Sequence, residues 1–180
     1  MKETTKQNII LIGFMGCGKT SVGERLAGCL SYQFKDTDQL IVKKTGDTIS
    51  KIFEKQGEEY FRNLETDLLI ELQPSLTHTV LSTGGGLPLR KQNMKLMQQL
   101  GQVIYLRTSK ETIADRLKGD TTRPLLQGDD YMEKIERMLL ARSTYYERAA
   151  HHIIDTDDRT VDELVTIIGT MINDQCRKEE

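Results

Sequence analysis

The stretch GFMGCGKT, residues 13–20, has the composition and spacing of a loop that binds phosphate groups. Gly13, Gly18, Lys19 and Thr20 match the pattern G-x-x-x-x-G-K-[ST]. Glycines let backbone N–H groups approach phosphate oxygens, and the N-terminus of the following helix favours their negative charge. We expect Lys19 to reach the β- and γ-phosphates of a nucleotide, and the Thr20 hydroxyl to bind Mg²⁺. A chance glycine-rich turn is the alternative, but the stretch also follows an apolar strand and opens a helix, as the motif requires.

Two aspartates in KDTDQL, Asp36 and Asp38, come at the end of a second expected strand. The other strands flanking the loop, HTVLST and QVIYLR, have no acidic residue at their ends, so Asp36 is the candidate for an indirect contact with Mg²⁺. Asp38 suits a neutral hydroxyl group, which a carboxylate can orient and whose proton it can accept. The alternative role for Asp38 is the N-cap of a helix, since TDQL can begin one.

Several classes of phosphate-loop protein lack support in this sequence. A guanine-reading [NT]-K-x-D motif is missing at the expected place, where TSKE follows QVIYLR. A motor ATPase would show a strand that ends in aspartate to hold the metal. A nucleoside monophosphate kinase would have to press the carboxylate of Asp38 against a phosphate acceptor, and two anions repel. These patterns favour a kinase whose acceptor is an alcohol.

Arginines at four places in the chain suggest that the acceptor or the donor carries negative charge. Arg62 lies on the predicted helix EEYFRNLE, where Glu65 can hold its guanidinium group. Arg142, like Arg148, lies on a long helix before the last strand, where an arginine is more often a solvated surface charge. Arg123 lies in KGDTTRPLLQGDD, a polar segment with the composition of a lid, and could neutralise charge on the transferred phosphoryl group. Arg116, on the preceding helix, could reach the nucleotide from the other side.

The elements that position these residues alternate along the chain. Apolar runs predict strands at 8–13, 32–36, 78–82, 102–107 and 151–156. Helical spacing predicts helices at 19–30, across 39–72 with breaks at Gly46 and Gly57, around 94–97, at 109–117, at 131–149 and at 161–172. Alternation of this kind predicts an α/β fold with a parallel sheet of about five strands covered on both faces. Ligands bind such folds at the carboxyl ends of the strands, where STGGG (82–86) offers backbone N–H groups to a small molecule.

Composition limits the partners of the chain. It has 180 residues, 37% of them hydrophobic, which is enough for a single domain with a core. A net charge of -2 and a pI near 6.0 argue against a general binder of nucleic acid or of lipid bilayers. The N-terminus is polar and no apolar run approaches the roughly 20 residues of a membrane span, so we expect a cytoplasmic protein.

Cysteines and histidines give no sign of a disulfide framework or a metal site. Cys17, Cys29 and Cys176 are far apart and odd in number, and the three histidines lack the spacing of metal ligands. Cys17 lies inside the phosphate loop, where a thiolate would be favoured electrostatically, although it can also be a small filler. Cys29 lies late in a helix that we expect to be buried there.

The ordered set of motifs resembles the shikimate kinase family over nearly the whole chain. The set is GFMGCGKT, DTDQLI, GEEYFRNLE, STGGG, RPLL, RSTYYERAA and IIDTDD. The resemblance implies a three-layer α/β/α P-loop NTPase fold with a central five-stranded parallel sheet and a mobile lid at about 119–130. It implies one domain over 1–180, with substrate bound by a helical region at about 38–65. The implied reaction is ATP-dependent phosphorylation of the 3-hydroxyl of shikimate, with Mg²⁺, in a monomer.

The resemblance also assigns roles to residues. Asp38, Lys19 and Arg123 would be catalytic. Shikimate would be held by Asp38, Arg62, Gly84, Gly85, Gly86 and Arg142. The nucleotide would be held by Gly16, Cys17, Gly18, Lys19, Thr20, Ser21, Arg116, Arg123 and Arg159, of which Arg159 lies in a variable segment of the family. Thr20 and Asp36 would hold the metal, Asp36 through water.

Two other functions remain as alternatives. A gluconate-type sugar-acid kinase would share the phosphate loop and the lid but should lack the combination of DTD, FRxxE and GGG. A non-catalytic ATP-binding module could lose its acceptor-site residues, yet Asp38, Arg62 and Arg142 are all present here.

Overall fold

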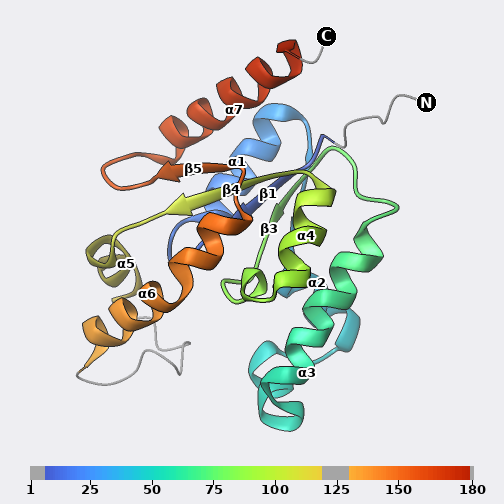
Figure 1. Ribbon diagram of the computed structural model, residues 1–180, viewed down its shortest axis with the longest axis vertical. Helices are drawn as coiled ribbons and strands as arrows, with labels where there is room; N and C mark the ends of the chain where they lie inside the picture. Colours follow the sequence, from blue (N-terminus) through green and yellow to red (C-terminus); the bar gives the residue numbers. More distant parts are fainter. Residues whose placement is uncertain (1–6, 119–129, 179–180) are drawn as a thin grey trace.

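The computed structural model describes residues 7–118 and 130–178, and the side chains as far as residue 172. Its strands are β1 (Ile9–Ile12), β2 (Gln33–Asp36), β3 (Thr79–Ser82), β4 (Gln102–Arg107) and β5 (His152–Asp155). Its α-helices are α1 (Lys19–Leu30), α2 (Thr37–Thr45), α3 (Ile49–Leu72), α4 (Lys91–Leu100), α5 (Lys110–Leu117), α6 (Tyr131–Ala149) and α7 (Val161–Lys178). A short 3₁₀ helix, η1 (Leu87–Leu89), was not expected. The predicted alternation of strands and helices is confirmed (Figure 1).

All strand pairs of the sheet are parallel, and the strand order is β2-β3-β1-β4-β5. After β1 the chain builds one side of the sheet with β2 and β3, and then it crosses to the other side with β4 and β5. Open α/β sheets bind ligands where the direction of building reverses, outside the carboxyl ends of the strands. Here that place lies at the ends of β1 and β3, where the phosphate loop and the glycines of STGGG begin.

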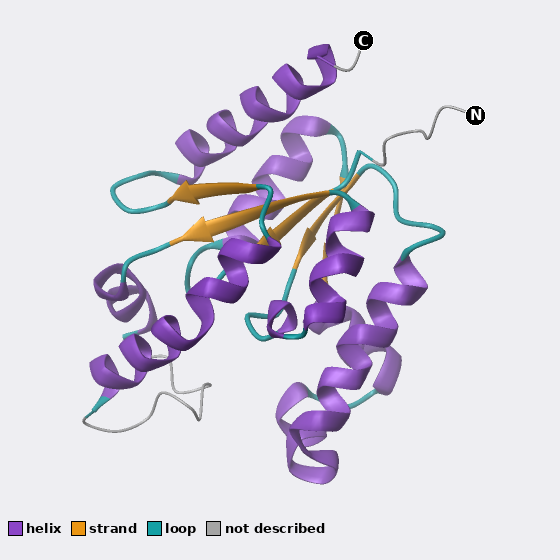
Figure 2. Cartoon of the chain, viewed as in Figure 1, coloured by secondary structure: helices purple, strands orange, loops and turns teal. Residues whose placement is uncertain are grey.

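Helices cover both faces of the sheet and enclose two separate cores (Figure 2). Side chains alternate along β1, so Ile9 and Leu11 pack with α1 and α7, whereas Ile10 and Ile12 pack with the helices on the opposite face. Because its side chains are buried on both faces of the sheet, the sequence of β1 is an uninterrupted run of apolar residues. The predicted three-layer α/β/α fold is confirmed.

The helices that follow β2 leave the sheet and pack on each other at one end of the molecule (Figure 1). Glycine breaks them where the sequence predicts: Gly46 ends α2 with a φ of 75°, and Gly57 interrupts α3 with a φ of 82°. These are left-handed conformations that glycine adopts at low cost. The expected helical region at about 38–65 is therefore present, in two helices with a kink in the second.

One expectation about the helices is wrong, and another lies outside the described residues. Cys29 lies seven residues after the buried Val22, on the same face of α1, so it was expected to be buried. It is exposed, because it lies in the last turn of α1, where Leu30 is also only partly buried. Residues 119–129, with Arg123, lie outside the described residues, and so does the side chain of Cys176. Within the described residues, none of the helices has the length and apolar character needed to cross a bilayer.

A buried asparagine fastens the amino-terminal end of the sheet. Asn8 is 0% exposed, and its Nδ2 donates to Leu76 O and Leu100 O at 2.9 Å each. Its Oδ1 accepts from Thr79 N at 3.1 Å, and its backbone O accepts from Gln102 N at 2.9 Å. One side chain thus joins the segments that lead into β3 and β4 to the start of β1.

We therefore predict that Asn8→Ala destabilises the fold by about 3 kcal/mol, because three buried backbone groups lose their partner at once. The free energy of unfolding in urea measures the loss. The control is Asn63→Ala, since Asn63 is exposed and accepts one bond from Arg90 at 2.8 Å. A loss at Asn8 as small as that at Asn63 would contradict this role.

Candidate active site

The phosphate loop connects β1 to α1 and has the geometry that its motif predicts. Gly18, at the N-cap of α1, has a φ of 96°, which only glycine adopts readily. Lys19 is 9% exposed, and its Nζ donates to Gly13 O and Phe14 O at 2.9 Å each. Backbone carbonyls of the loop therefore hold the ammonium group in place.

Cys17 points from this loop into the core rather than toward solvent. It is 1% exposed and packs in the core under α1, with its Sγ 3.6 Å from Lys19 Nζ. Its backbone N–H donates to Phe14 O at 3.3 Å. Both the thiol and the N–H of Cys17 are thus engaged inside the protein, which favours the interpretation of Cys17 as a filler. The exposed Cys29 is the more accessible of the two thiols.

A cleft of about 470 Å³ opens above the loop at the carboxyl ends of the strands. Most of the predicted nucleotide and metal residues line it. They are Gly16, Cys17, Gly18, Lys19, Thr20, Ser21, Asp36, Arg116 and Arg159, together with Asp38, Gly84 and Gly85 from the predicted substrate site. Arg116 also donates to Gly16 O at 3.3 Å. The structure thus brings together segments from β1, β2, β3, α5 and the stretch before α7.

The two aspartates of DTD have different structural roles. Asp36 is the N-cap of α2, since its Oδ1 accepts from Asp38 N at 2.9 Å and from Gln39 N at 3.2 Å. The alternative role of Asp38 as the N-cap is therefore wrong, because the cap lies two residues earlier. Asp36 faces the cleft as well, so the residue predicted to meet Mg²⁺ also fixes the start of the helix that carries Asp38.

Asp38 and Glu65 meet beside the glycines that follow β3. A β-carbon on Gly84 would lie 2.7 Å from Asp38 Oδ1 and 3.1 Å from Glu65 Oε1. The Gly84 N–H is not available to a ligand, because it donates to Thr37 Oγ1 at 2.9 Å. Carboxylates from α2 and α3 therefore share one small space that only a glycine leaves open.

Arg62 is held by two glutamates on its own helix. Its Nη1 donates to Glu65 Oε2 at 2.7 Å and its Nη2 to Glu58 Oε1 at 3.0 Å, and its side chain is 13% exposed. A β-carbon on Gly86 would lie 2.4 Å from the Arg62 guanidinium, so this cation also requires a glycine beside it. Arg62 is not among the residues that line the cleft, and it lies against Gly86 of the glycine turn (residues 84–86), next to Glu65.

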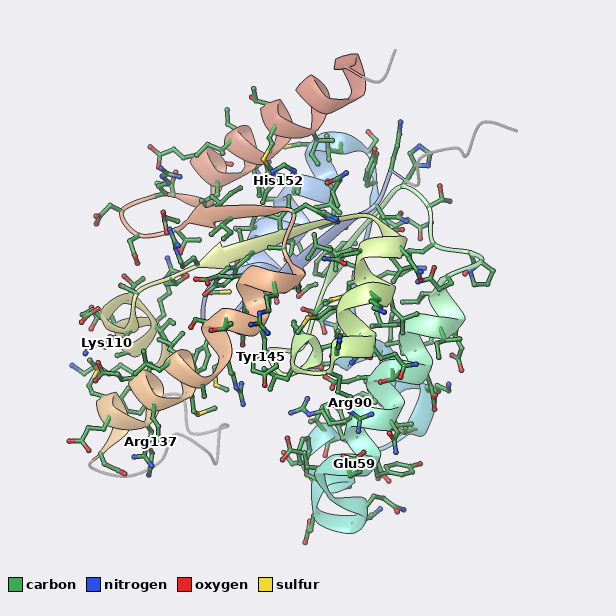
Figure 3. The ribbon with its side chains drawn as sticks, in the orientation of Figure 1. Glu59, Arg90, Lys110, Arg137, Tyr145 and His152 are labelled. Carbon is green, nitrogen blue, oxygen red and sulfur yellow. The ribbon has the colours of Figure 1, made fainter. Side chains whose placement is uncertain are left out.

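Burial strongly perturbs the carboxyl group of Glu65. Its side chain is 0% exposed, and burial raises its pKa to about 7, although the Arg62 guanidinium opposes this shift. The negative charge of Asp38 raises the pKa further, and Arg90 lowers it. Arg90 in turn forms an ion pair with Glu59 on the outer side of α3 (Figure 3). Among the described residues, Glu65 Oε1 has no hydrogen-bond partner.

Arg142 approaches the site from α6. Its guanidinium carbon lies 5.7 Å from the centre of the Phe14 ring, which is the geometry of a cation–π contact. It does not line the cleft as the structure stands. Arg148, on the same helix, is exposed.

Sequence reasoning missed the buried polar residues that hold the glycine turn. Thr37 accepts from Gly84 N, and Tyr146 Oη donates to Gly85 O at 2.6 Å. Asn93 donates to Leu87 O at 3.0 Å and accepts from Thr66. Thr37 could have been found from the sequence, because it lies between the two aspartates of DTD. Nothing in one sequence pairs Tyr146 with a glycine 61 residues away.

Comparisons with known proteins agree on one family. The family model described as shikimate kinase matches residues 15–173. A shikimate kinase from Thermodesulfovibrio yellowstonii is 44% identical over 158 residues, covering 88% of this chain and 90% of the relative. One from Geobacter sulfurreducens is 40% identical, covering 93% and 92%. The solved structure of a shikimate kinase from Acinetobacter baumannii in complex with shikimate has a TM-score of 0.88 and 41% identity, covering 96% of each chain.

The raised pKa of Glu65 makes a prediction about stability. Between its ordinary value of 4.5 and about 7, Glu65 binds a proton in the folded protein but not in the unfolded chain. Folding therefore loses stability through Glu65 as the pH rises over this range. We predict that the free energy of unfolding of the wild type, relative to Glu65→Gln, falls between pH 5 and pH 8.

Carbon-13 NMR of the glutamate carboxyl groups measures the pKa directly. One group should titrate near pH 7 in the wild type and be missing in Glu65→Gln. Glu58→Gln is the control, since Glu58 binds the same arginine but is exposed, and this variant should keep the signal. If every glutamate titrates below pH 5.5, Glu65 is not perturbed.

Proposed function

The chain belongs to the shikimate kinase family, and from this premise we propose how its residues carry out the reaction. It is an ATP-dependent kinase that phosphorylates shikimate in aromatic amino acid biosynthesis. We propose that the 3-hydroxyl of shikimate is the group that receives the phosphoryl group. The observation that carries this proposal is the meeting of the phosphate loop with Asp38 at the glycines after β3.

On the donor side, the phosphate loop would hold the phosphates of ATP. Lys19 is already placed at the loop by two carbonyl oxygens, and a bound phosphate offers its ammonium group a stronger partner. Thr20 and Ser21 are exposed to the cleft at the first turn of α1. A hydroxyl and a carboxylate that share the cleft fit the ligand chemistry of Mg²⁺, so we propose Thr20 and Asp36 as its protein partners. When bound, Mg²⁺ would neutralise negative charge on the phosphates.

On the acceptor side, Asp38 would orient the 3-hydroxyl and accept its proton. Its Oδ1 lies beside Gly84, on the wall of the cleft that also holds the phosphate loop, so a hydroxyl bound to Asp38 can face the terminal phosphate. Arg62 and Arg142 would hold the carboxylate of shikimate from two sides of the glycine turn. Gly85 and Gly86 would complete that site with backbone N–H groups.

The remaining arginines would serve the nucleotide. Arg116 and Arg159 also line the cleft, and we propose that they contact the base or the sugar of the nucleotide. Arg123 is proposed to stabilise the charge of the transferred phosphoryl group, on the basis of the sequence alone. A monomer in the cytoplasm, without nucleic-acid partners, also stays a prediction from the sequence.

A coupled assay tests the function and its nearest rival. The protein should consume ATP with shikimate and should leave gluconate unphosphorylated, because Asp38, Arg62 and Arg142 together suit a ring with hydroxyl groups and a carboxylate. Turnover of gluconate would support the sugar-acid kinase instead. ATP binding without turnover of either acceptor would support the non-catalytic module.

We predict that Asp38→Asn lowers kcat by at least about a hundredfold, the usual size of a lost general base. The affinity for ATP should stay within about threefold, because Asp38 lies on the acceptor side. Steady-state kinetics and a nucleotide titration measure the two effects. Asp67→Asn, at an exposed position of α3, is the matched control. Near-normal kcat in Asp38→Asn would restrict Asp38 to a structural role.

We also predict that Arg62→Ala and Arg142→Ala each weaken shikimate binding by about 1.5–3 kcal/mol, the size of a charge-assisted hydrogen bond. The loss should be much smaller for an analogue in which the carboxylate is a neutral amide. Calorimetric titration with both compounds gives the difference. Arg148→Ala, at an exposed arginine of α6, should bind both as the wild type does. Equal losses for both compounds would mean that the two arginines are structural.

A further inference from the structure

Two helices hold the backbone of the turn after β3 (residues 84–86), one through an N–H group and the other through a carbonyl group. The Gly84 N–H donates to Thr37 Oγ1 at 2.9 Å, which ties the turn to α2. The Gly85 carbonyl accepts from Tyr146 Oη at 2.6 Å, which ties the turn to α6. Leu87 N donates to Gly84 O at 3.1 Å and so begins η1, against which α6 packs.

The hydroxyl group of Tyr146 is buried inside the protein and therefore needs a hydrogen-bond partner there. Tyr146 is 0% exposed, and its ring packs against Tyr105 at 5.1 Å between ring centres. Burying a hydroxyl group costs free energy unless it forms a hydrogen bond, and Gly85 O supplies the partner. The charge of Arg142, one helical turn earlier, also acts on this hydroxyl, although burial is the larger effect and raises the pKa of Tyr146.

The bond to Gly85 O also fixes the direction of the next N–H group. A trans peptide points its C=O and its N–H to opposite sides, and the described chain has no cis peptide. With Gly85 O directed at α6, the Gly86 N–H must point away from α6. Neither Gly85 N–H nor Gly86 N–H donates a hydrogen bond to another described residue. Gly85 is partly exposed and lines the cleft, so its N–H can meet a ligand there, and Gly86 is buried directly beside it.

We infer that Tyr146 is a positioning residue for the acceptor site. Tyr146 holds the Gly85–Gly86 peptide and Arg142 in a fixed position relative to one another. The Tyr146 hydroxyl group donates to the carbonyl of Gly85, and Arg142 lies four residues earlier on the same helix, with its guanidinium carbon 5.7 Å from the centre of the Phe14 ring. Since both are proposed to bind the carboxylate of shikimate, Tyr146 sets the shape of that anion site without touching the substrate. This inference rests on the function proposed above.

The variant Tyr146→Phe tests the inference, because it keeps the buried ring and removes only the donor. The KM for shikimate should rise roughly tenfold, which is the loss of about one hydrogen bond, and the KM for ATP should stay within twofold. The rise should be clearly smaller for the neutral amide analogue, which a general loosening of the fold would not produce. Tyr105→Phe is the matched control, since Tyr105 is a buried tyrosine of the same ring pair and should leave both KM values unchanged.

Melting temperatures of both variants are measured beside the kinetics. If Tyr146→Phe unfolds, 4-fluorophenylalanine at position 146 fills the space of the hydroxyl without donating, and the same rise in KM is expected. An unchanged KM for shikimate in a folded variant overturns the inference, and so does an equal rise for shikimate, its amide and ATP. These outcomes leave wild-type turnover of shikimate intact. A wild type without such turnover overturns the proposed function, and the inference with it.

Discussion

The insertion of β3 between β2 and β1 is the constraint on which the rest of the site depends. Ser82, the last residue of β3, pairs with Asp36 on one side and with Leu11 on the other. Thr83 then fastens the strand by donating to Leu11 O from both its N–H and its hydroxyl. The phosphate loop, the aspartates of DTD and the glycine turn consequently leave the sheet at one level, so the phosphate donor and its acceptor can meet.

The balance of charge behind the glycine turn is the second requirement. Asp38 and Glu65 lie together beside Gly84, and Glu65 shares the guanidinium group of Arg62 with Glu58. A buried anion without full compensation takes up a proton, which is what the raised pKa of Glu65 expresses. Protonation of Glu65 would remove one of the two carboxylate charges that lie against Arg62, the arginine proposed to meet the carboxylate of the substrate. Glycines leave the room that this arrangement needs.

Features that depend on spacing within one segment could be predicted from the sequence. The phosphate loop, the two glycine breaks at Gly46 and Gly57, and the alternation of strands and helices belong to this group. Lys19 and Asp38 followed from them, because parallel strands bring their carboxyl ends to one edge. The identity of the N-cap could not be read from DTD, since Asp36 and Asp38 both suit it and only the backbone decides. The contact of Tyr146 with Gly85 joins residues that only the tertiary structure brings together.

The length and stiffness of α6 have an energetic consequence. The helix has 19 residues and therefore extends for about 28 Å. It begins at Tyr131, shortly after the segment that contains Arg123, and its last turn carries Tyr146, which holds the acceptor turn. If one substrate displaced either end of α6, a rigid helix would carry that displacement to the other end and would couple the free energies of binding the two substrates. Such coupling is reciprocal: whatever one substrate gains from the presence of the other, the other gains in equal measure.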